Sequence, residues 1–227
     1  MFNYLRTKRI GVVILDNRIQ ITYNHRTTEY PFANKIFYYR EVSRFEECET
    51  FIKRIFKGLY SFLFRMFGNL EVYVTNNPLS GELEIRALND IFKTERCVKQ
   101  IHLIGFPTAA FIGLRLDDKS ENVLIDLDED VCYISVLNYG TISQYKEVKA
   151  DNPRMENAIL KTVKMLTDNK YREMNIWLIC SNRNIRQIHH SLQKKMKTKV
   201  HLTDSNTVIS DGIDMIIYER SGWAAFK

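Results

Sequence analysis

The chain has 227 residues, of which 45% are hydrophobic and 26% are charged. These are ordinary values for a globular protein, and the length suffices for one large or two small domains. No stretch of about 18 uncharged apolar residues occurs, which argues against a transmembrane helix. The first residues also lack the apolar run of a signal peptide. The net charge of +6 permits contact with anionic lipid or nucleic acid but requires neither.

The four cysteines are scattered, with no C-x-x-C pair that would suggest a redox or zinc motif. They are Cys48, Cys97, Cys132 and Cys180. Isolated cysteines of this kind are typical of buried, reduced thiols in a cytosolic protein. We therefore expect a cytoplasmic location.

The first half of the chain alternates apolar strand patterns with amphipathic helix patterns. The expected strands are 9–15, 18–24, 35–40, 70–75 and 98–104. The expected helices are 44–67, 80–95 and a short one at 108–114. This order, βββαβαβα, is that of an RNase H-like unit.

The second half repeats the same order, which indicates two tandem copies of one unit. The expected strands are 122–127, 131–138, 141–149, 175–180 and 199–203. The expected helices are 152–167, 183–197 and 206–219. We predict an α/β fold of two RNase H-like lobes, residues 1–117 and 118–227. Each lobe should hold a mixed five-stranded sheet flanked by helices.

The expected helix 44–67 has apolar side chains around most of its circumference. A helix buried under the sheet would explain this pattern. Alternatively, its excess apolar face contacts a partner or a bilayer. Gly68 should end the helix.

The hairpin of residues 121–140 has an unusual tip, Asp128-Glu129-Asp130. Tight hairpin turns usually contain Gly or Asn, because their backbone requires positive φ angles. Three consecutive carboxylates provide neither a glycine nor a neutral surface. The strand that leads into the tip, NVLIDL, contains one carboxylate, Asp126.

This hairpin resembles the second phosphate loop of the actin superfamily, and of bacterial MreB in particular. Leu124, Ile125, Asp126 and Leu127 match the strand and its Asp, whereas residues 128–130 replace three glycines. The stretches IHLIGFPTAAFIG (101–113) and RMENAI (154–159) also resemble MreB. The resemblance implies an actin core whose outer subdomains are missing, because Arg40 leads almost directly into helix 44–67 and only residues 168–174 separate 152–167 from 175–180.

The resemblance also assigns four parts of a nucleotide site, and each part has lost residues that nucleotide binding or hydrolysis would need. Val13 and Leu15 replace an Asp and a Gly of the first phosphate loop. Glycines of the second loop are needed so that backbone N–H groups can bind phosphate, but here the acidic tip would repel it. Phe106 replaces the catalytic acid before Pro107 and cannot deprotonate water. The adenosine-side glycines are replaced at Cys180, Ser181 and Asn182. We therefore expect a pseudo-ATPase with no cofactor and no small-molecule substrate.

Two other functions remain open at this point. The first is a divergent ATPase or metal-dependent enzyme that uses Asp126 and the acidic tip. Asp126, Asp128 and Asp130 have the spacing that begins an EF-hand loop, but Val131 and Leu137 stand where that loop needs Gly and Glu. The second is a nucleic-acid-binding module, which only the basic charge suggests. We expect no nucleic-acid partner.

The N-terminus suggests a membrane contact. Phe2, Tyr4 and Leu5 precede a group of basic residues, a pattern suited to shallow insertion beside anionic lipids. We expect a scaffold or interaction protein of the bacterial cell-shape or division cytoskeleton, at the inner face of the cell membrane. Its partner would be an MreB filament or a membrane protein associated with one.

Overall fold

The structure, a computed structural model, describes residues 7–15, 17–32, 35–38, 40–117, 119–127, 131–149, 155–180 and 185–218. These residues form two compact units. Unit 1 contains residues 7–106 and 213–218, and unit 2 contains residues 107–212. The α/β fold with two five-stranded lobes is thus confirmed, whereas the predicted limit between residues 117 and 118 stays a prediction.

Unit 1 is built on a mixed five-stranded sheet in the order β3-β2-β1-β6-β7. Strands β1, β2 and β3 are antiparallel, whereas β1, β6 and β7 run parallel. The strands are β1 (Lys8–Ile14), β2 (Arg18–Tyr23), β3 (Arg26–Pro31), β6 (Leu70–Asn76) and β7 (Val98–Gly105). The central strands are buried on both faces because helices cover them, which is why they appear as continuous apolar runs.

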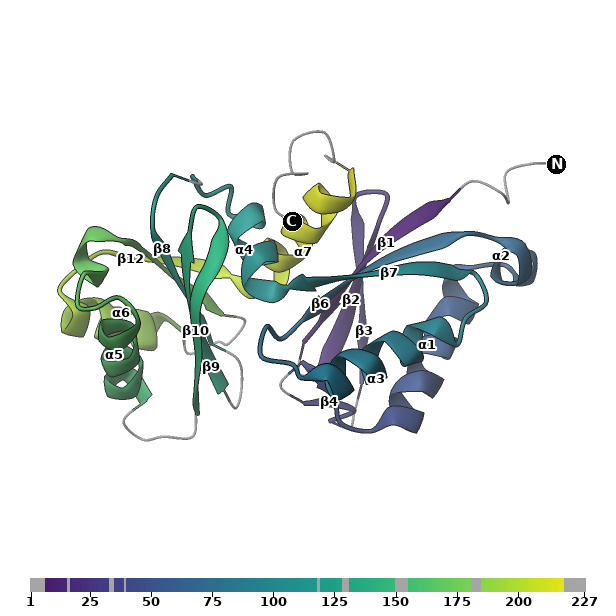
Figure 1. Ribbon diagram of the computed structural model, residues 1–227, viewed down its shortest axis with the longest axis horizontal. Helices are drawn as coiled ribbons and strands as arrows, with labels where there is room; N and C mark the ends of the chain where they lie inside the picture. The colour runs from purple at the N-terminus through teal and green to yellow at the C-terminus, as the bar shows by residue number, and fades with distance from the viewer. Residues whose placement is uncertain are drawn as a thin grey trace. The chain divides into compact units, whose positions relative to one another are not determined.

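Helices α1 (Phe45–Leu59) and α3 (Glu82–Lys93) lie side by side against one face of this sheet (Figure 1). Their apolar stripes pack on the alternate side chains of β1 in one continuous core. The opposite face receives the last turns of α7 (Ser205–Tyr218). Gly11 of β1 lets that helix approach, because a Cβ there would lie 2.1 Å from Cγ2 of Ile213.

The third strand of this sheet is β3, so the prediction of a sheet strand at 35–40 is wrong. There the chain forms only β4 (Phe37–Tyr38), which pairs with β5 (Glu41–Val42). β3 follows a turn in which Asn24 and His25 both have positive φ, as a tight hairpin requires. It is an exposed edge strand with a mostly polar sequence, so no apolar alternation marks it.

The single helix expected over residues 44–67 is also wrong, because it is broken in two. α1 ends at Leu59, Tyr60 is extended, and α2 (Phe62–Phe67) begins at a new cap where Ser61 Oγ accepts a hydrogen bond from Phe64 N–H. The Tyr60 ring turns into the core and packs 4.8 Å from the Phe64 ring. Gly68 ends α2, as the sequence predicted.

Unit 2 repeats this sheet with the order β10-β9-β8-β11-β12. Its strands are β8 (Asn122–Leu127), β9 (Val131–Asn138), β10 (Thr141–Lys149), β11 (Asn175–Cys180) and β12 (Val200–Asp204). Its helices include α5 (Met155–Leu166) and α6 (Ile185–Met196), which Figure 1 shows side by side against the sheet. The first residues of the expected helix 152–167, up to residue 154, lie outside the described residues.

The connections beyond each three-stranded meander are short. Residues 32–44 join β3 to α1, and their described part forms only the β4–β5 pair. Residues 167–174 join α5 to β11 and contain a single 3-10 turn, η1 (Tyr171–Glu173).

Within unit 2, helices α4 (Phe106–Gly113) and α7 touch backbone to backbone. A Cβ on Gly113 would lie 1.9 Å from the Val208 carbonyl oxygen, and one on Gly212 would lie 1.8 Å from the Ala109 carbonyl oxygen. Because these atoms belong to rigid helix backbones, neither can move aside alone. The two glycines therefore set the distance between the helices.

We predict that Gly212→Ala lowers the free energy of unfolding by about 3 kcal/mol, because the added methyl group forces the two helices apart. The matched control is Gly58→Ala in α1, where a Cβ meets nothing within 4 Å. That change should raise stability by about 0.5–1 kcal/mol, because alanine is the better helix former. Urea unfolding of both variants checks this, and equal stabilities would contradict the close contact.

Candidate functional site

The end of β1, where the first phosphate loop was expected, is a packed apolar segment. Val13 and Leu15 are only 1% and 5% exposed. Val13 lies opposite Gln20 of β2, and the Leu15 N–H donates to the Arg18 carbonyl at 3.0 Å. These side chains contain no group that binds phosphate or a metal-bound water. The structure thus places both residues in the interior of unit 1.

Phe106, which occupies the expected position of the catalytic acid, is the first residue of α4 and is buried. Its partner is Arg40, whose guanidinium carbon lies 3.8 Å from the centre of the Phe106 ring. Arg40 is itself buried and has a positive φ of 62°. A guanidinium over an aromatic face is attracted by the ring quadrupole. Phe106 therefore serves as a packing surface for a buried cation.

Asp126 lies on β8 at the centre of the unit 2 sheet and is only 3% exposed. It is in register with Tyr133 on β9 and with Ile179 on β11. Its neighbours Ile125 and Leu127 point into the apolar cluster, so the carboxylate lies on the opposite face of the sheet. The tip residues Asp128, Glu129 and Asp130 lie outside the described residues.

Cys180 ends β11 and packs in the apolar core of unit 2. It is in register with Leu127, which is in turn in register with Cys132 of β9, so the two thiols flank one residue of β8. Burial, and after it the negative charge of Asp126, raises the pKa of Cys132 well above its ordinary value. The thiol therefore stays protonated at neutral pH. Ser181 and Asn182 lie outside the described residues.

The nucleotide-site positions that the resemblance assigns fall into two sets, one in each unit. In unit 1, Leu15 follows β1 and Phe106 follows β7, and both strands belong to the parallel part of the sheet. In unit 2, Asp126 and Cys180 lie at the carboxyl ends of the parallel strands β8 and β11. Ligands of α/β sheets bind at this edge. The positions that the resemblance assigns thus lie at the sheet edge where a ligand would bind. Those that the structure describes are all buried. Asp126 is the one among them with a charged side chain, since the others are aliphatic, aromatic or a thiol.

Within the described part of the chain, no group of three His, Cys, Asp or Glu side chains lies close enough to hold a metal ion. No helix among the described residues is long and apolar enough to cross a membrane. The membrane contact predicted at Phe2, Tyr4 and Leu5 lies outside the described residues.

Sequence reasoning missed a cavity of about 740 Å³ in unit 1, beside α2. Its walls include Lys8, Tyr23, Tyr60, Ser61, Phe64 and Tyr218. These residues come from β1, β2, the break between α1 and α2, and the end of α7. No sequence pattern links such distant segments, so only the tertiary structure shows the cavity.

The sequence matches no family model and no curated protein. Solved structures do match, at low sequence identity. MreB5 of Spiroplasma citri bound to ADP aligns with a TM-score of 0.71 and 9% identity, over 94% of this chain and 97% of that chain. EutJ of Carboxydothermus hydrogenoformans aligns with a TM-score of 0.66 and 11% identity, over 90% and 88%. The MamK double helical filament gives 0.64 and 8%, over 94% and 99%.

This chain has the actin-like fold. At least nine tenths of the chain aligns with EutJ and MreB5, with TM-scores of 0.66 and 0.71, although they share only about a tenth of its residues. At such identity the likeness establishes the fold and leaves the activity open. What the chain does is therefore inferred first from the buried residues described above.

We predict that Phe106→Ala lowers the free energy of unfolding by about 3–5 kcal/mol, because it opens a cavity under the buried Arg40 guanidinium. Phe106→Leu, which keeps most of the volume, should cost about 1.5 kcal/mol or less. Thermal and urea unfolding check this order. A Phe106→Ala variant as stable as the wild type would show that residue 106 is an open site position and not a packed one.

Proposed function

We propose that this chain is a pseudo-ATPase with an actin-like fold, acting as a scaffold or interaction protein of the bacterial cell-shape or division cytoskeleton. The observation that carries the proposal is the contact between Phe106 and Arg40. A hydrolysing enzyme needs a base at the position of Phe106 to orient and deprotonate the attacking water. A buried ring covered by a guanidinium offers no such group and leaves no space for one.

The end of β1 supports the same proposal. Phosphate binding at a strand end needs backbone N–H groups that face an open site and small residues that allow close approach. Here the Leu15 N–H is already used by the Arg18 carbonyl, and the Ile14 N–H by Thr75 Oγ1 at 3.1 Å. With those donors engaged and Val13 and Leu15 buried, this strand end is built for packing.

The scaffold role is supported by what other proteins of this fold form. MamK is solved as a double helical filament, and PilM is solved with PilN in a type IV pilus biogenesis complex. The PilM structure aligns with a TM-score of 0.58 and 8% identity, over 88% of this chain and 89% of that chain. Both of these proteins assemble with other protein chains, and we extend this role to the present chain. Its function would be to bind a protein, either an MreB filament or a membrane protein associated with one.

The alternative, a divergent ATPase or metal-dependent enzyme that uses Asp126 and the acidic tip, stays a prediction. Asp126 lies at the carboxyl-terminal end of a parallel strand, as a catalytic carboxylate would. The tip residues that would have to join it are outside the described residues.

Phosphate release from ATP distinguishes the two functions. With Mg²⁺ and millimolar ATP, the purified full chain should release phosphate no faster than buffer, and Asp126→Asn should not change that rate. A circular dichroism spectrum identical to that of the wild type shows that the variant is folded. Mg²⁺-dependent release that Asp126→Asn abolishes would refute the pseudo-ATPase and support the enzyme.

A further inference from the structure

Helix α2 presents three large apolar side chains to the solvent. Phe62, Leu63 and Phe67 are 71%, 50% and 66% exposed. All three come from one helix of six residues, and Phe64 is the residue of that helix that is buried. A concentrated apolar projection of this kind usually marks a contact with a membrane or another molecule.

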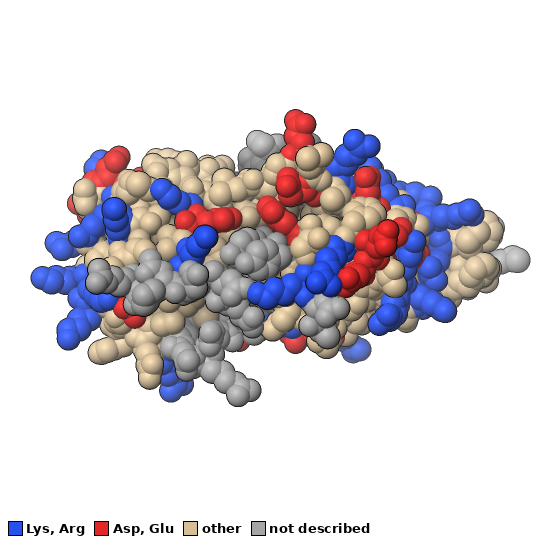
Figure 2. All heavy atoms as spheres, turned by 90° about the horizontal axis from the view of Figure 1, so that it is seen from below, with Lys and Arg blue, Asp and Glu red and all other residues tan. Residues whose placement is uncertain are grey.

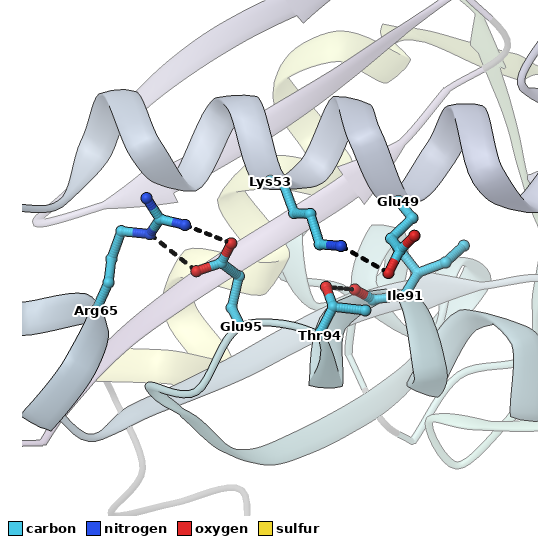
Figure 3. A network of polar contacts seen from close by, with 6 residues as sticks. All are labelled: Glu49, Lys53, Arg65, Ile91, Thr94 and Glu95. Atoms are coloured by element: carbon cyan, nitrogen blue, oxygen red, sulfur yellow. Dashed lines mark hydrogen bonds and ion pairs between the residues drawn. The ribbon is translucent and has the colours of Figure 1, made fainter. Parts of the chain in front are cut away.

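The projection is held rigidly on unit 1. Arg65 of α2 makes a bidentate ion pair with Glu95, with Nε and Nη2 each 2.9 Å from a carboxylate oxygen (Figure 3). Glu95 is almost fully buried, so the pair is screened little by solvent. Together with the inward Phe64 ring and the Gly68 cap, this pair fixes the direction in which Phe62 and Phe67 project.

Several basic side chains lie near this projection. The acidic residues of α1 lie in its first turns, whereas Lys53, Arg54 and Lys57 lie in the half that leads to α2. Arg96 lines a small hollow together with Phe62, Glu95 and Lys53, and Lys53 is itself ion-paired with Glu49 at 2.8 Å. In Figure 2, Lys and Arg side chains gather at both ends, and the right-hand end is where Figure 1 places α2. Apolar tips within a basic rim are complementary to an anionic bilayer.

Among the described residues, the Lys8 ammonium in the cavity beside α2 has no acidic partner. The Lys8 ammonium lies 4.4 Å from the Phe64 ring centre, 5.2 Å from that of Tyr60 and 5.8 Å from that of Tyr23. Among the described residues that line the cavity there is no Asp or Glu. Ring faces attract the ammonium without cancelling its charge, so the cavity favours an anionic group.

Hydroxyl groups in the cavity wall can donate to that anion. Burial raises the pKa of Tyr60 and of Tyr218, so both phenols keep their protons at neutral pH. The Tyr218 oxygen accepts a hydrogen bond from Asn24 N–H at 2.7 Å, which leaves its own proton to donate outward. Phenol donors near a lysine suit the oxygens of a phosphate.

We propose that unit 1 binds an anionic phospholipid of a bilayer, with the phosphate headgroup in the Lys8 cavity and Phe62, Leu63 and Phe67 among the acyl chains. A lipid fits better than a soluble anion because the cavity and the apolar projection share helix α2. Ser61 and Phe64 line the cavity, while their neighbours point outward. This binding does not depend on the absence of ATP hydrolysis, so the two proposals can fail separately.

Flotation of the full chain with vesicles tests the proposal. Vesicles of phosphatidylcholine with phosphatidylglycerol should bind it, and vesicles of phosphatidylcholine alone should bind it at least tenfold more weakly. Phe62→Ser with Phe67→Ser should weaken binding about tenfold or more, because the inserted apolar area is lost. Lys8→Gln should weaken it about fivefold, the effect of one basic residue at an anionic surface.

Matched changes on α3 serve as controls. Leu83→Ser removes an apolar side chain that is 78% exposed, and Lys93→Gln removes an exposed lysine, yet neither residue lies on α2 or lines the cavity. Both variants should bind vesicles as the wild type does. Unchanged circular dichroism spectra establish that the test variants are folded.

Three results would overturn the proposal. One is equal binding to neutral and anionic vesicles. A second is the loss of binding on deletion of residues 1–6 with no effect of the α2 or Lys8 variants, which would assign the contact to Phe2, Tyr4 and Leu5. The third is binding of sn-glycerol 3-phosphate, lost in Lys8→Gln, by a chain that binds no vesicle. That result would make the cavity a site for a soluble phosphate.

Discussion

The contact between α4 and α7 is the constraint on which this structure depends. At Gly113 and Gly212 the two helices meet with no side chain between their backbones. α7 then continues into unit 1, where Ile213 packs against Gly11 of β1. Glycines at these positions let one helix pack in both units. A methyl group at Gly113 or Gly212 would force α4 and α7 apart within unit 2, and one at Gly11 would displace Ile213 within unit 1.

The same packing determines what the strand ends can do. In unit 1 the positions after β1 and β7 are filled by Leu15 and Phe106, and Phe106 also supports the buried Arg40. A site that binds and releases a nucleotide needs exposed hydrogen-bond donors and open space. Leu15 and Phe106 instead stabilise the fold by filling that space and keeping water out. Under the proposed function, the actin-like fold is kept while packing takes the place of nucleotide chemistry at the strand ends of unit 1.

Sequence patterns predicted most strands of the two large sheets, because buried parallel strands give long apolar runs such as RIGVVIL and NIWLIC. They missed β3 because an edge strand exposed to solvent has no apolar alternation. They missed the break at Tyr60 because nothing local stops a helix there, and the Tyr60 ring finds its place only in the tertiary core. The stacking of Arg40 on Phe106 and the cavity at Lys8 were equally invisible, since each joins residues distant in the chain.

The pseudo-ATPase proposal concerns the strand ends, whereas the phospholipid proposal concerns helix α2 and the Lys8 cavity. The two proposals therefore involve different parts of the protein. Packed strand ends would leave the fold without a nucleotide-driven change, and the basic end of unit 1 would place it on an anionic membrane. A fixed, membrane-bound lobe is suited to hold a partner in position. The projection of α2 and the filled interior at Phe106 are separate features, so evolution could alter either without the other.

Calorimetric titration of the full chain with ATP and ADP, with and without Mg²⁺, tests the central claim most directly. If packing has replaced the nucleotide site, millimolar concentrations of either nucleotide should release no heat beyond dilution. Saturable, Mg²⁺-dependent heat would contradict the account. It would mean that Asp126 and the acidic tip bind nucleotide through a cation, and that the buried residues of unit 1 do not decide the activity.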